Sequence, residues 1–197
     1  MKPKLIGITG GIGAGKSTVS KICKHLGFKV YNSDDRAKEI VSEDSNIKKR
    51  IISFFGNNVY KNGVLDRKFL SNKIFNDKSS LQNINSIIHP AVKKDFNNWV
   101  INNSNEKVLF KESALLFESG AYKELDKIIL IVSDKNLRIS RVLKRDKIRS
   151  KKEIESIIDK QINEVDAIKY ADIVIDNNHK KMLLPSVIRQ IEKLTPE

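Results

Sequence analysis

The chain has 197 residues, and its 37 lysines and arginines against 24 aspartates and glutamates give a formal net charge of +13 at pH 7. This length suits one α/β domain with insertions, and no apolar run is long enough to span a bilayer. We expect no secretory leader, because the amino terminus runs directly into the first predicted strand. The single cysteine, Cys23, excludes an internal disulfide. Together these features predict a cytoplasmic protein that does not associate with membranes.

The positive charge is spread along the chain rather than gathered in one segment. Lysines occur in nearly every part of the sequence, beside many asparagines and isoleucines. A basic surplus can mark a protein that binds nucleic acid or a membrane surface. Because no zinc-binding spacing, RNA-recognition signature or heptad repeat accompanies it, we expect solvated faces and no nucleic-acid partner. A non-catalytic nucleotide- or RNA-binding module is kept as an alternative.

The first predicted strand, residues 4–9, leads into a glycine-rich stretch. Residues 10–17 read Gly-Gly-Ile-Gly-Ala-Gly-Lys-Ser, which matches the phosphate-binding P-loop pattern of a glycine, four spacers and Gly-Lys-Ser. After it, apolar residues recur at helical spacing, at Val19, Ile22, Cys23 and Leu26. The order of strand, glycine loop and helix is the one that a nucleoside triphosphate site requires.

The residues of this loop have distinct predicted roles. Glycines at positions 11, 13 and 15 let the backbone curl, so that successive N–H groups form an anion-binding nest at the start of the helix. Lys16 is predicted to reach the β- and γ-phosphates, and the Ser17 hydroxyl to bind Mg²⁺. The predicted ATP-binding residues of the loop are Gly11, Ile12, Gly13, Ala14, Gly15, Lys16, Ser17 and Thr18.

A second predicted strand, residues 28–31, ends shortly before Asp34. In open α/β sheets the carboxyl ends of the strands face the ligand. The Asp34 carboxylate is therefore suited to accept the proton of an acceptor hydroxyl or to hold Mg²⁺ through water. It is equally suited to cap the following helix together with Ser33 and Asp35. The residues alone favour neither role.

A long and mostly helical stretch, residues 43–105, precedes the next core strand at residues 108–110. Helical periodicity recurs through it, and His89-Pro90 predicts a helix break because proline disfavours helix in the residue before it. An insertion of this size is predicted to bind the acceptor. Its scarcity of arginines favours a hydroxyl acceptor over a phosphate acceptor, with a nucleoside or nucleotide kinase as the alternative.

The remaining elements are two strands, a charged helical segment between them and a closing helix. The strands are predicted at residues 128–132 and 173–175, and strands that alternate with helices favour a parallel sheet in a single α/β domain. The helical segment covers residues 133–161, and the closing helix residues 182–194. The predicted layout is a core at 1–42, 106–137 and 165–197, an acceptor-binding insertion at about 43–105 and a lid at about 138–164.

Four arginines in the charged segment are spaced to share one helix face, or nearly so: Arg138, Arg141, Arg145 and Arg149. An exposed charged helix explains such a run. A mobile lid whose guanidinium groups close over the phosphates also explains it. On the second interpretation we predict that Arg141 and Arg145 stabilise charge during transfer.

The sequence resembles the dephospho-coenzyme A kinase family over nearly its whole length. Many families share the P-loop, whereas Leu65-Asp66-Arg67, His89-Pro90 and Leu115-Leu116-Phe117-Glu118 at these separations are more specific. The other matching blocks are residues 7–18, 26–28 with Asp34, 55–56, 63–67, 145–146, Gln161 and 171–177.

This resemblance implies a P-loop kinase fold, with a five-stranded parallel sheet flanked by helices, a helical CoA-binding insertion and a lid. It implies that ATP, with Mg²⁺, phosphorylates the ribose 3′-hydroxyl of dephospho-CoA to give CoA and ADP. Asp34 then becomes the expected base or metal-linked carboxylate, and Asn177 is expected near adenine. The catalytic residues are expected to be Asp34, Lys16, Arg141 and Arg145, and the substrate-binding residues Asp34, Asp66, Arg67 and His89. We expect a monomer or a weak homo-oligomer.

The sequence departs from the family pattern at a few positions. Asn32 stands where many relatives have the first of two aspartates, and Ala167 stands where an arginine is often found. Lys38 follows Ala37 in place of an arginine. The departure at Ala167, with Lys169 as the nearest cation, concerns one adenine or phosphate contact and not the reaction. Glu112, at the end of the third core strand, is a candidate replacement for a metal-shell aspartate.

Overall fold

The structure is a computed structural model that describes residues 2–75, 77–178 and 182–194. The chain forms two compact units. The core unit comprises residues 1–32 and 103–197, and the helical unit comprises Ser33–Asn102. The helical unit starts at Ser33, whereas the sequence pattern places the start of the insertion near residue 43. The whole of the first helix after the second strand therefore belongs to the helical unit.

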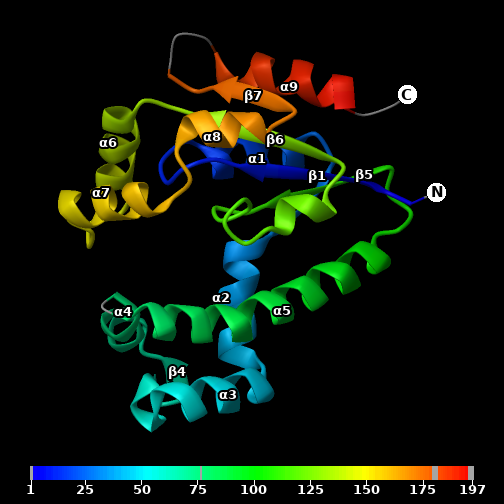
Figure 1. Ribbon diagram of the computed structural model, residues 1–197. Helices are drawn as coiled ribbons and strands as arrows, with labels where there is room; N and C mark the ends of the chain where they lie inside the picture. The colour runs from blue at the N-terminus through cyan, green and yellow to red at the C-terminus, as the bar shows by residue number, and fades with distance from the viewer. Residues whose placement is uncertain (1, 76, 179–181, 195–197) are drawn as a thin grey trace. The chain divides into compact units, whose positions relative to one another are not determined.

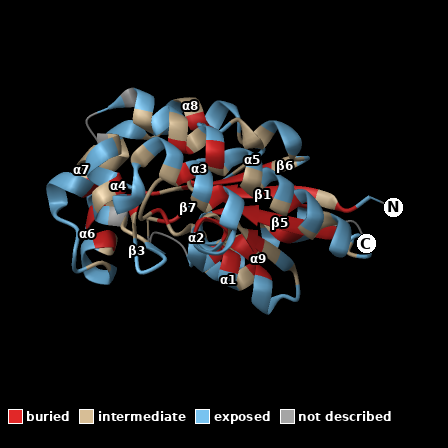
Figure 2. Ribbon diagram, turned by 90° about the horizontal axis from the view of Figure 1, so that it is seen from below, coloured by how far each residue is buried: buried red, intermediate tan, exposed pale blue. Residues whose placement is uncertain are grey.

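The core unit is built on a parallel sheet of five strands in the order β2-β5-β1-β6-β7. The strands are β1 (Lys4–Thr9), β2 (Lys29–Asn32), β5 (Val108–Glu112), β6 (Lys127–Val132) and β7 (Ile173–Asp176). Apolar side chains make β1 and β5 buried along nearly their whole length (Figure 2). Strands covered on both faces are typical of parallel sheets. The predicted five-stranded α/β fold is thereby confirmed.

Helices cover the two faces of this sheet (Figure 1). On one face α1 (Lys16–His25) and α9 (Leu183–Leu194) pack on the strands, through residues such as Val19, Val187 and Ile191. On the other face lie α8 (Glu164–Lys169), the short helix η2 (Ala121–Glu124) and the loop after β5, with Leu116, Phe117 and Ala167 in the packing. α6 (Lys135–Arg145) and α7 (Lys151–Lys160) pack on each other around Val142 and Ile154.

Cys23 lies in the core between α1 and the sheet and is fully buried. Burial raises the pKa of its thiol to about 12. The thiol is therefore protonated at neutral pH, and Cys23 acts as a small core residue, as its place on the apolar face of the first helix predicts.

The helical unit, drawn from blue-cyan to green in Figure 1, has its own apolar core. Its elements are α2 (Ser33–Glu43), α3 (Ser45–Phe55), η1 (Asn57–Val59), the hairpin strands β3 (Tyr60–Lys61) and β4 (Val64–Leu65), α4 (Arg67–Phe75) and α5 (Lys78–Asn102). Ile51, Val59 and Ile87 are fully buried in it. The Asp44 carboxylate caps α3 by accepting from the N–H groups of Asn46 and Ile47.

The predicted helix break at His89-Pro90 is wrong, because α5 continues through Pro90 and ends only at Asn102. Proline removes one helical hydrogen bond and crowds the preceding turn. The buried side chains of Ile84, Ile87 and Phe96 lie on both sides of Pro90 along the helix. Their burial in a long helix offsets the local cost, so the preference of a single dipeptide does not decide the element.

The predicted shared face of the four arginines is also wrong for Arg149. Helix α6 ends at Arg145, and Asp146 stops it. Arg149 lies in the connection to α7, where its guanidinium pairs with the Asp146 carboxylate at 3.2 Å. Ser150 then starts α7 with a capping box that Glu153 completes. Only Arg138, Arg141 and Arg145 belong to α6.

Within the described ranges, no helix is both long and apolar enough to cross a membrane.

Candidate active site

The glycine loop joins β1 to α1 at the carboxyl edge of the sheet, as predicted. Gly10, Gly13 and Gly15 have φ values of 149°, 78° and 111°, in the region that residues with a side chain rarely adopt. Gly15 is the N-cap of α1. Because the loop leads into the amino terminus of α1, which is the positive end of the helix, its geometry fits the predicted anion-binding nest.

Lys16 bends back over the start of the loop. Its Nζ donates to the carbonyl oxygen of Gly10 at 2.8 Å and to that of Gly11 at 3.2 Å. The ammonium group is thus held beside the loop by main-chain oxygens, at the distance that charge-assisted hydrogen bonds favour. This geometry fits the predicted role of Lys16 as a cation for the β- and γ-phosphates.

The peptide groups of Ile12 are fixed by two distant side chains. The Ile12 N–H donates to Oε1 of Gln161 at 2.8 Å, and the Ile12 carbonyl accepts from Nε of Arg138 at 2.9 Å. Gln161 follows α7, and Arg138 lies in α6. The tip of the glycine loop is therefore fastened to the segment predicted to be the lid.

Asn177 holds the other end of the loop. Its side chain is buried, and Nδ2 donates to the carbonyl oxygen of Ala14 at 2.8 Å. A Cβ on Gly15 would overlap this amide, so glycine is required there for a close approach as well as for its φ. The predicted contact of Asn177 with adenine stays a prediction, since its amide group already binds the loop.

Arg141 belongs to the same network. Its guanidinium donates to the carbonyl oxygen of Asn177 at 2.8 Å and to Oγ of Ser133 at 3.0 Å, and reaches the Gly13 carbonyl at 3.4 Å. Burial lowers the pKa of Arg141 from its ordinary value. Arg145, one turn further along α6, is exposed. The structure thus brings Arg141 to the loop and leaves Arg145 at its helix end.

A carboxylate lies at the carboxyl end of β5, next to the loop strand. Glu112 is buried and pairs in register with Ile8 of β1, and its Oε2 accepts from the Asn32 amide at 3.3 Å. The exposed Ser17 hydroxyl lies in the first turn of α1. Among the described residues no group of three or more His, Cys, Asp or Glu side chains could hold a metal by itself.

This donor set fits Mg²⁺ rather than zinc. Mg²⁺ prefers oxygen ligands, keeps several waters and takes much of its coordination from substrate phosphates. Such an ion needs few protein ligands, so the Ser17 hydroxyl and the Glu112 carboxylate are the residues that could hold it.

Asp34 lies two residues beyond β2, in the first turn of α2, and its side chain is exposed. In the alternative interpretation, Asp34 caps α2 together with Ser33 and Asp35. The buried Ser33 hydroxyl has no hydrogen-bond partner among the described atoms, and Asp35 pairs with Lys38 at 2.6 Å. Ser33 therefore does not cap α2 through its hydroxyl, which weakens the shared-cap interpretation.

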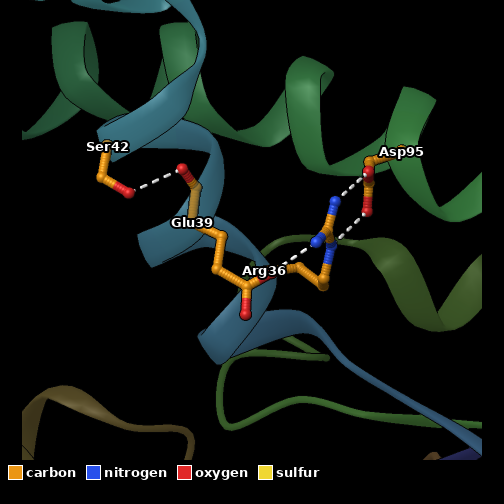
Figure 3. A network of polar contacts seen from close by, with 4 residues as sticks. All are labelled: Arg36, Glu39, Ser42 and Asp95. Atoms are coloured by element: carbon orange, nitrogen blue, oxygen red, sulfur yellow. Dashed lines mark hydrogen bonds and ion pairs between the residues drawn. The ribbon is translucent and has the colours of Figure 1, made fainter.

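The same turn of α2 carries an ion-pair network within the helical unit (Figure 3). Arg36 donates from Nε and Nη2 to the two carboxylate oxygens of Asp95 in α5, at 2.9 and 2.6 Å, and also pairs with Glu39. A bidentate arginine–carboxylate pair fixes direction as well as distance. Through this pair the start of α2 is attached to α5.

The predicted substrate residues lie in the helical unit. Asp66 caps α4 by accepting from the Phe69 N–H at 2.9 Å, and its other oxygen pairs with Lys61 of the hairpin at 2.6 Å. The Lys61 ammonium, followed by the Phe69 N–H, lowers the pKa of Asp66. His89 is exposed on α5, and the Arg67 side chain lies outside the described part of the structure. Their contacts with substrate stay predictions.

Sequence reasoning missed the contacts of Arg138 and Gln161 with Ile12. The arginine spacing singled out Arg138, and the family resemblance singled out Gln161, but neither signal indicates which main-chain group a side chain will reach. The two residues are 126 and 149 positions away from Ile12 along the chain. Only the packing of α6 and α7 brings them to the loop.

The sheet order and the glycine loop define a P-loop kinase fold. Shikimate kinase from Acinetobacter baumannii shares this fold, with a TM-score of 0.51 over 98% of this chain and 92% of that one at 16% identity. Dephospho-CoA kinase from Campylobacter jejuni superposes with a TM-score of 0.71, at 30% identity over 97% of this chain and 96% of that one.

A family model described as dephospho-CoA kinase matches residues 4–182. The dephospho-CoA kinase of Fusobacterium nucleatum is 42% identical over 194 residues, which are 98% of this chain and 97% of the relative. That of Bacteroides fragilis is 35% identical over 94% of this chain and 90% of the relative. The chain therefore belongs to the dephospho-CoA kinase family.

Proposed function

We propose that the protein transfers the γ-phosphoryl group of ATP to the ribose 3′-hydroxyl of dephospho-CoA, giving CoA and ADP in the cytoplasm. Membership of the family supports the reaction. The observation that carries the proposal is the glycine loop between β1 and α1, with Lys16 bent over it. This arrangement binds a triphosphate by its main chain and leaves the terminal phosphate accessible to a hydroxyl.

In this mechanism the groups of the chain bind the phosphates and accept a proton. The N–H nest and Lys16 hold the β- and γ-phosphates and offset the charge that spreads over the transferred oxygens. Asp34 accepts the proton of the 3′-hydroxyl as its oxygen attacks the γ-phosphorus. The bond from that phosphorus to the bridging oxygen breaks, and ADP leaves with the electron pair.

We propose that Ser17 and Glu112 would hold Mg²⁺ in the nucleotide complex. When bound, the ion neutralises charge on the β- and γ-oxygens and orients them for in-line attack. The position of Glu112 supports this assignment, because it lies at the carboxyl edge of the sheet on the strand next to β1, and ligands of open parallel sheets bind at that edge.

An acceptor competition tests the function. Purified protein with ATP and Mg²⁺ is offered dephospho-CoA, AMP, adenosine and pantothenate in separate assays that measure ADP release. We expect turnover with dephospho-CoA and formation of CoA by mass. Turnover on AMP in its place would make the protein a nucleotide kinase.

A non-catalytic nucleic-acid module is tested in the same preparation. It predicts salt-sensitive RNA binding that survives Lys16→Ala. We expect no such binding at physiological salt, and loss of phosphoryl transfer in that variant.

A further inference from the structure

Arg138 of α6 lies directly against the glycine loop. A Cβ on Gly13 would overlap the main chain of Arg138, and a Cβ on Gly11 would overlap its guanidinium. Both glycines are therefore needed for α6 and its arginine to rest directly on the loop.

The donors of Arg138 are only partly used. Its Nε donates to the carbonyl oxygen of Ile12 at 2.9 Å. Across the described residues, no acceptor is hydrogen-bonded to its two terminal nitrogens. By contrast, the terminal nitrogens of Arg141 donate to oxygens of Gly13, Ser133 and Asn177. Arg138 thus has one nitrogen anchored to the loop and two nitrogens available for a ligand.

Arg138 is partly withdrawn from solvent. Its side chain is half-buried, and it borders a small cavity of about 30 Å³ together with Gly10, Gly11 and Gln161 and with two carboxylates, Glu118 and Glu164. Burial lowers the pKa of Arg138, and the charge of Glu164 opposes that shift. An arginine keeps its charge in proteins. A partly desolvated guanidinium with free donors is stabilised by an anionic ligand.

Two cationic side chains contact Gly11. Lys16 donates to its carbonyl oxygen at 3.2 Å, and the Arg138 guanidinium packs against its Cα side. Lys16 is the residue of this loop that reaches the β- and γ-phosphates. A guanidinium that borders the same residue is therefore placed for the distal end of the triphosphate and not for its adenosine end.

We propose that Arg138 is a catalytic arginine of this enzyme, which binds the terminal phosphoryl group of ATP through its two terminal nitrogens while its Nε stays on the Ile12 carbonyl. It donates to the non-bridging oxygens of the γ-phosphate, over which the charge of the transferred group is spread in the transition state. This inference deepens the proposed function and rests on it for the transfer step. Arginines placed in this way contribute most in the transition state.

The test compares ATP with ADP. Dissociation constants for both nucleotides are measured by isothermal titration for the wild type, Arg138→Gln and Arg138→Lys. Because ADP lacks the γ-phosphate, the substitutions should weaken ATP binding about tenfold or more and change ADP binding less than threefold. The rate of CoA formation should fall about a thousandfold in Arg138→Gln.

A matched control is Arg189→Lys, which makes the same change at an exposed arginine of α9 and should leave both constants unchanged. If the substitutions weaken ATP binding and ADP binding equally, Arg138 only holds the glycine loop, and the inference is wrong. If the binding of both nucleotides is unchanged, the inference is wrong as well. If Arg138→Gln fails to fold, Arg138→Lys decides by the same ratio.

The readout is independent of the acceptor. A wild-type protein that binds ATP but does not phosphorylate dephospho-CoA would contradict the proposed function. The ratio of ATP affinity to ADP affinity would still test the role of Arg138.

Discussion

The core unit and the helical unit place their polar residues in different ways. In the core unit, buried or half-buried polar side chains from distant segments bind the main chain of the glycine loop, as Gln161 and Asn177 do. In the helical unit, the polar side chains pair with neighbours or cap helices, as Asp44 and Asp66 do, and isoleucines supply the core.

This difference indicates where each unit is sensitive to substitution. A change at a core-unit side chain that binds the glycine loop should alter nucleotide binding, because the loop depends on those contacts. A polar change in the helical unit should leave nucleotide binding intact and affect either the acceptor or stability. The following experiments test this contrast, in order of decreasing expected effect.

Lys16→Ala and Asp34→Ala should both abolish CoA formation, for different reasons. Lys16 belongs to the core unit and holds the phosphates, so its loss should also weaken ATP binding. Asp34 belongs to the helical unit and takes the acceptor proton, so its loss should reduce kcat about 10²- to 10⁴-fold and leave ATP binding measurable. Steady-state kinetics and nucleotide titration separate the two. A kcat of Asp34→Ala within about tenfold of the wild type would make that carboxylate a helix cap.

Ile129→Ala and Ile51→Ala remove the same atoms from fully buried sites in the two units. Each should lower the free energy of unfolding by about 2–5 kcal/mol. Ile51→Ala should keep the wild-type dissociation constant for ATP, because its cavity lies in the helical unit. Calorimetric unfolding with and without ATP measures both quantities. A large loss of ATP affinity in Ile51→Ala would contradict the division into units.

The Arg36–Asp95 pair should contribute about 0.5–1 kcal/mol to stability, since the exposed fractions of the two side chains are 40% and 25% and solvent screens the pair. A double-mutant cycle with Arg36→Met and Asp95→Asn measures the coupling. Arg36→Lys is the control, because it keeps the charge and loses the bidentate geometry. If the pair also orients α2, kcat should fall in Arg36→Met at an unchanged dissociation constant for ATP.

Asp66 should give the smallest effect. Its pKa is held below the ordinary 3.8 by Lys61 and by the Phe69 N–H. A carboxyl whose pKa is lowered on folding stabilises the protein above its ordinary pKa, and this stabilisation disappears as the pH falls through the lowered value. Asp66→Asn keeps the cap and loses the ion pair.

The melting temperature of Asp66→Asn should therefore lie slightly below that of the wild type at pH 7 and approach it below about pH 4. Asp66→Ala removes the cap as well and should melt lower at both pH values. A gap between wild type and Asp66→Asn that widens in acid would refute this account.

Local patterns predict much of the core unit. The strand at residues 4–9 and the glycine loop after it are signalled by adjacent residues, and the structure has them where the sequence predicts. The order of the strands is set by which surfaces pack, so the place of β5 between β1 and β2 has no local signal. For the same reason the His89-Pro90 dipeptide predicts a helix break that the structure does not have, because the burial of side chains along α5 stabilises the continuous helix.

The candidate site divides in the same way. Gly13, Gly15 and Lys16 are recognisable because their roles depend on the chain next to them. Arg138 was visible as one arginine in a series, yet its approach to Gly11 depends on α6 resting on a loop more than a hundred residues earlier. The roles of Asp34 and His89 need a bound acceptor and stay predictions.

The single cysteine of the chain offers a natural reporter of opening. Cys23 is sealed between α1 and the sheet that carries the glycine loop, and its thiolate form is suppressed. A thiol reagent can therefore modify it only when that packing separates. The rate of modification in native buffer measures how often the nucleotide-binding half unfolds, without any introduced label, and saturating ATP should slow it in proportion to the affinity of the folded state.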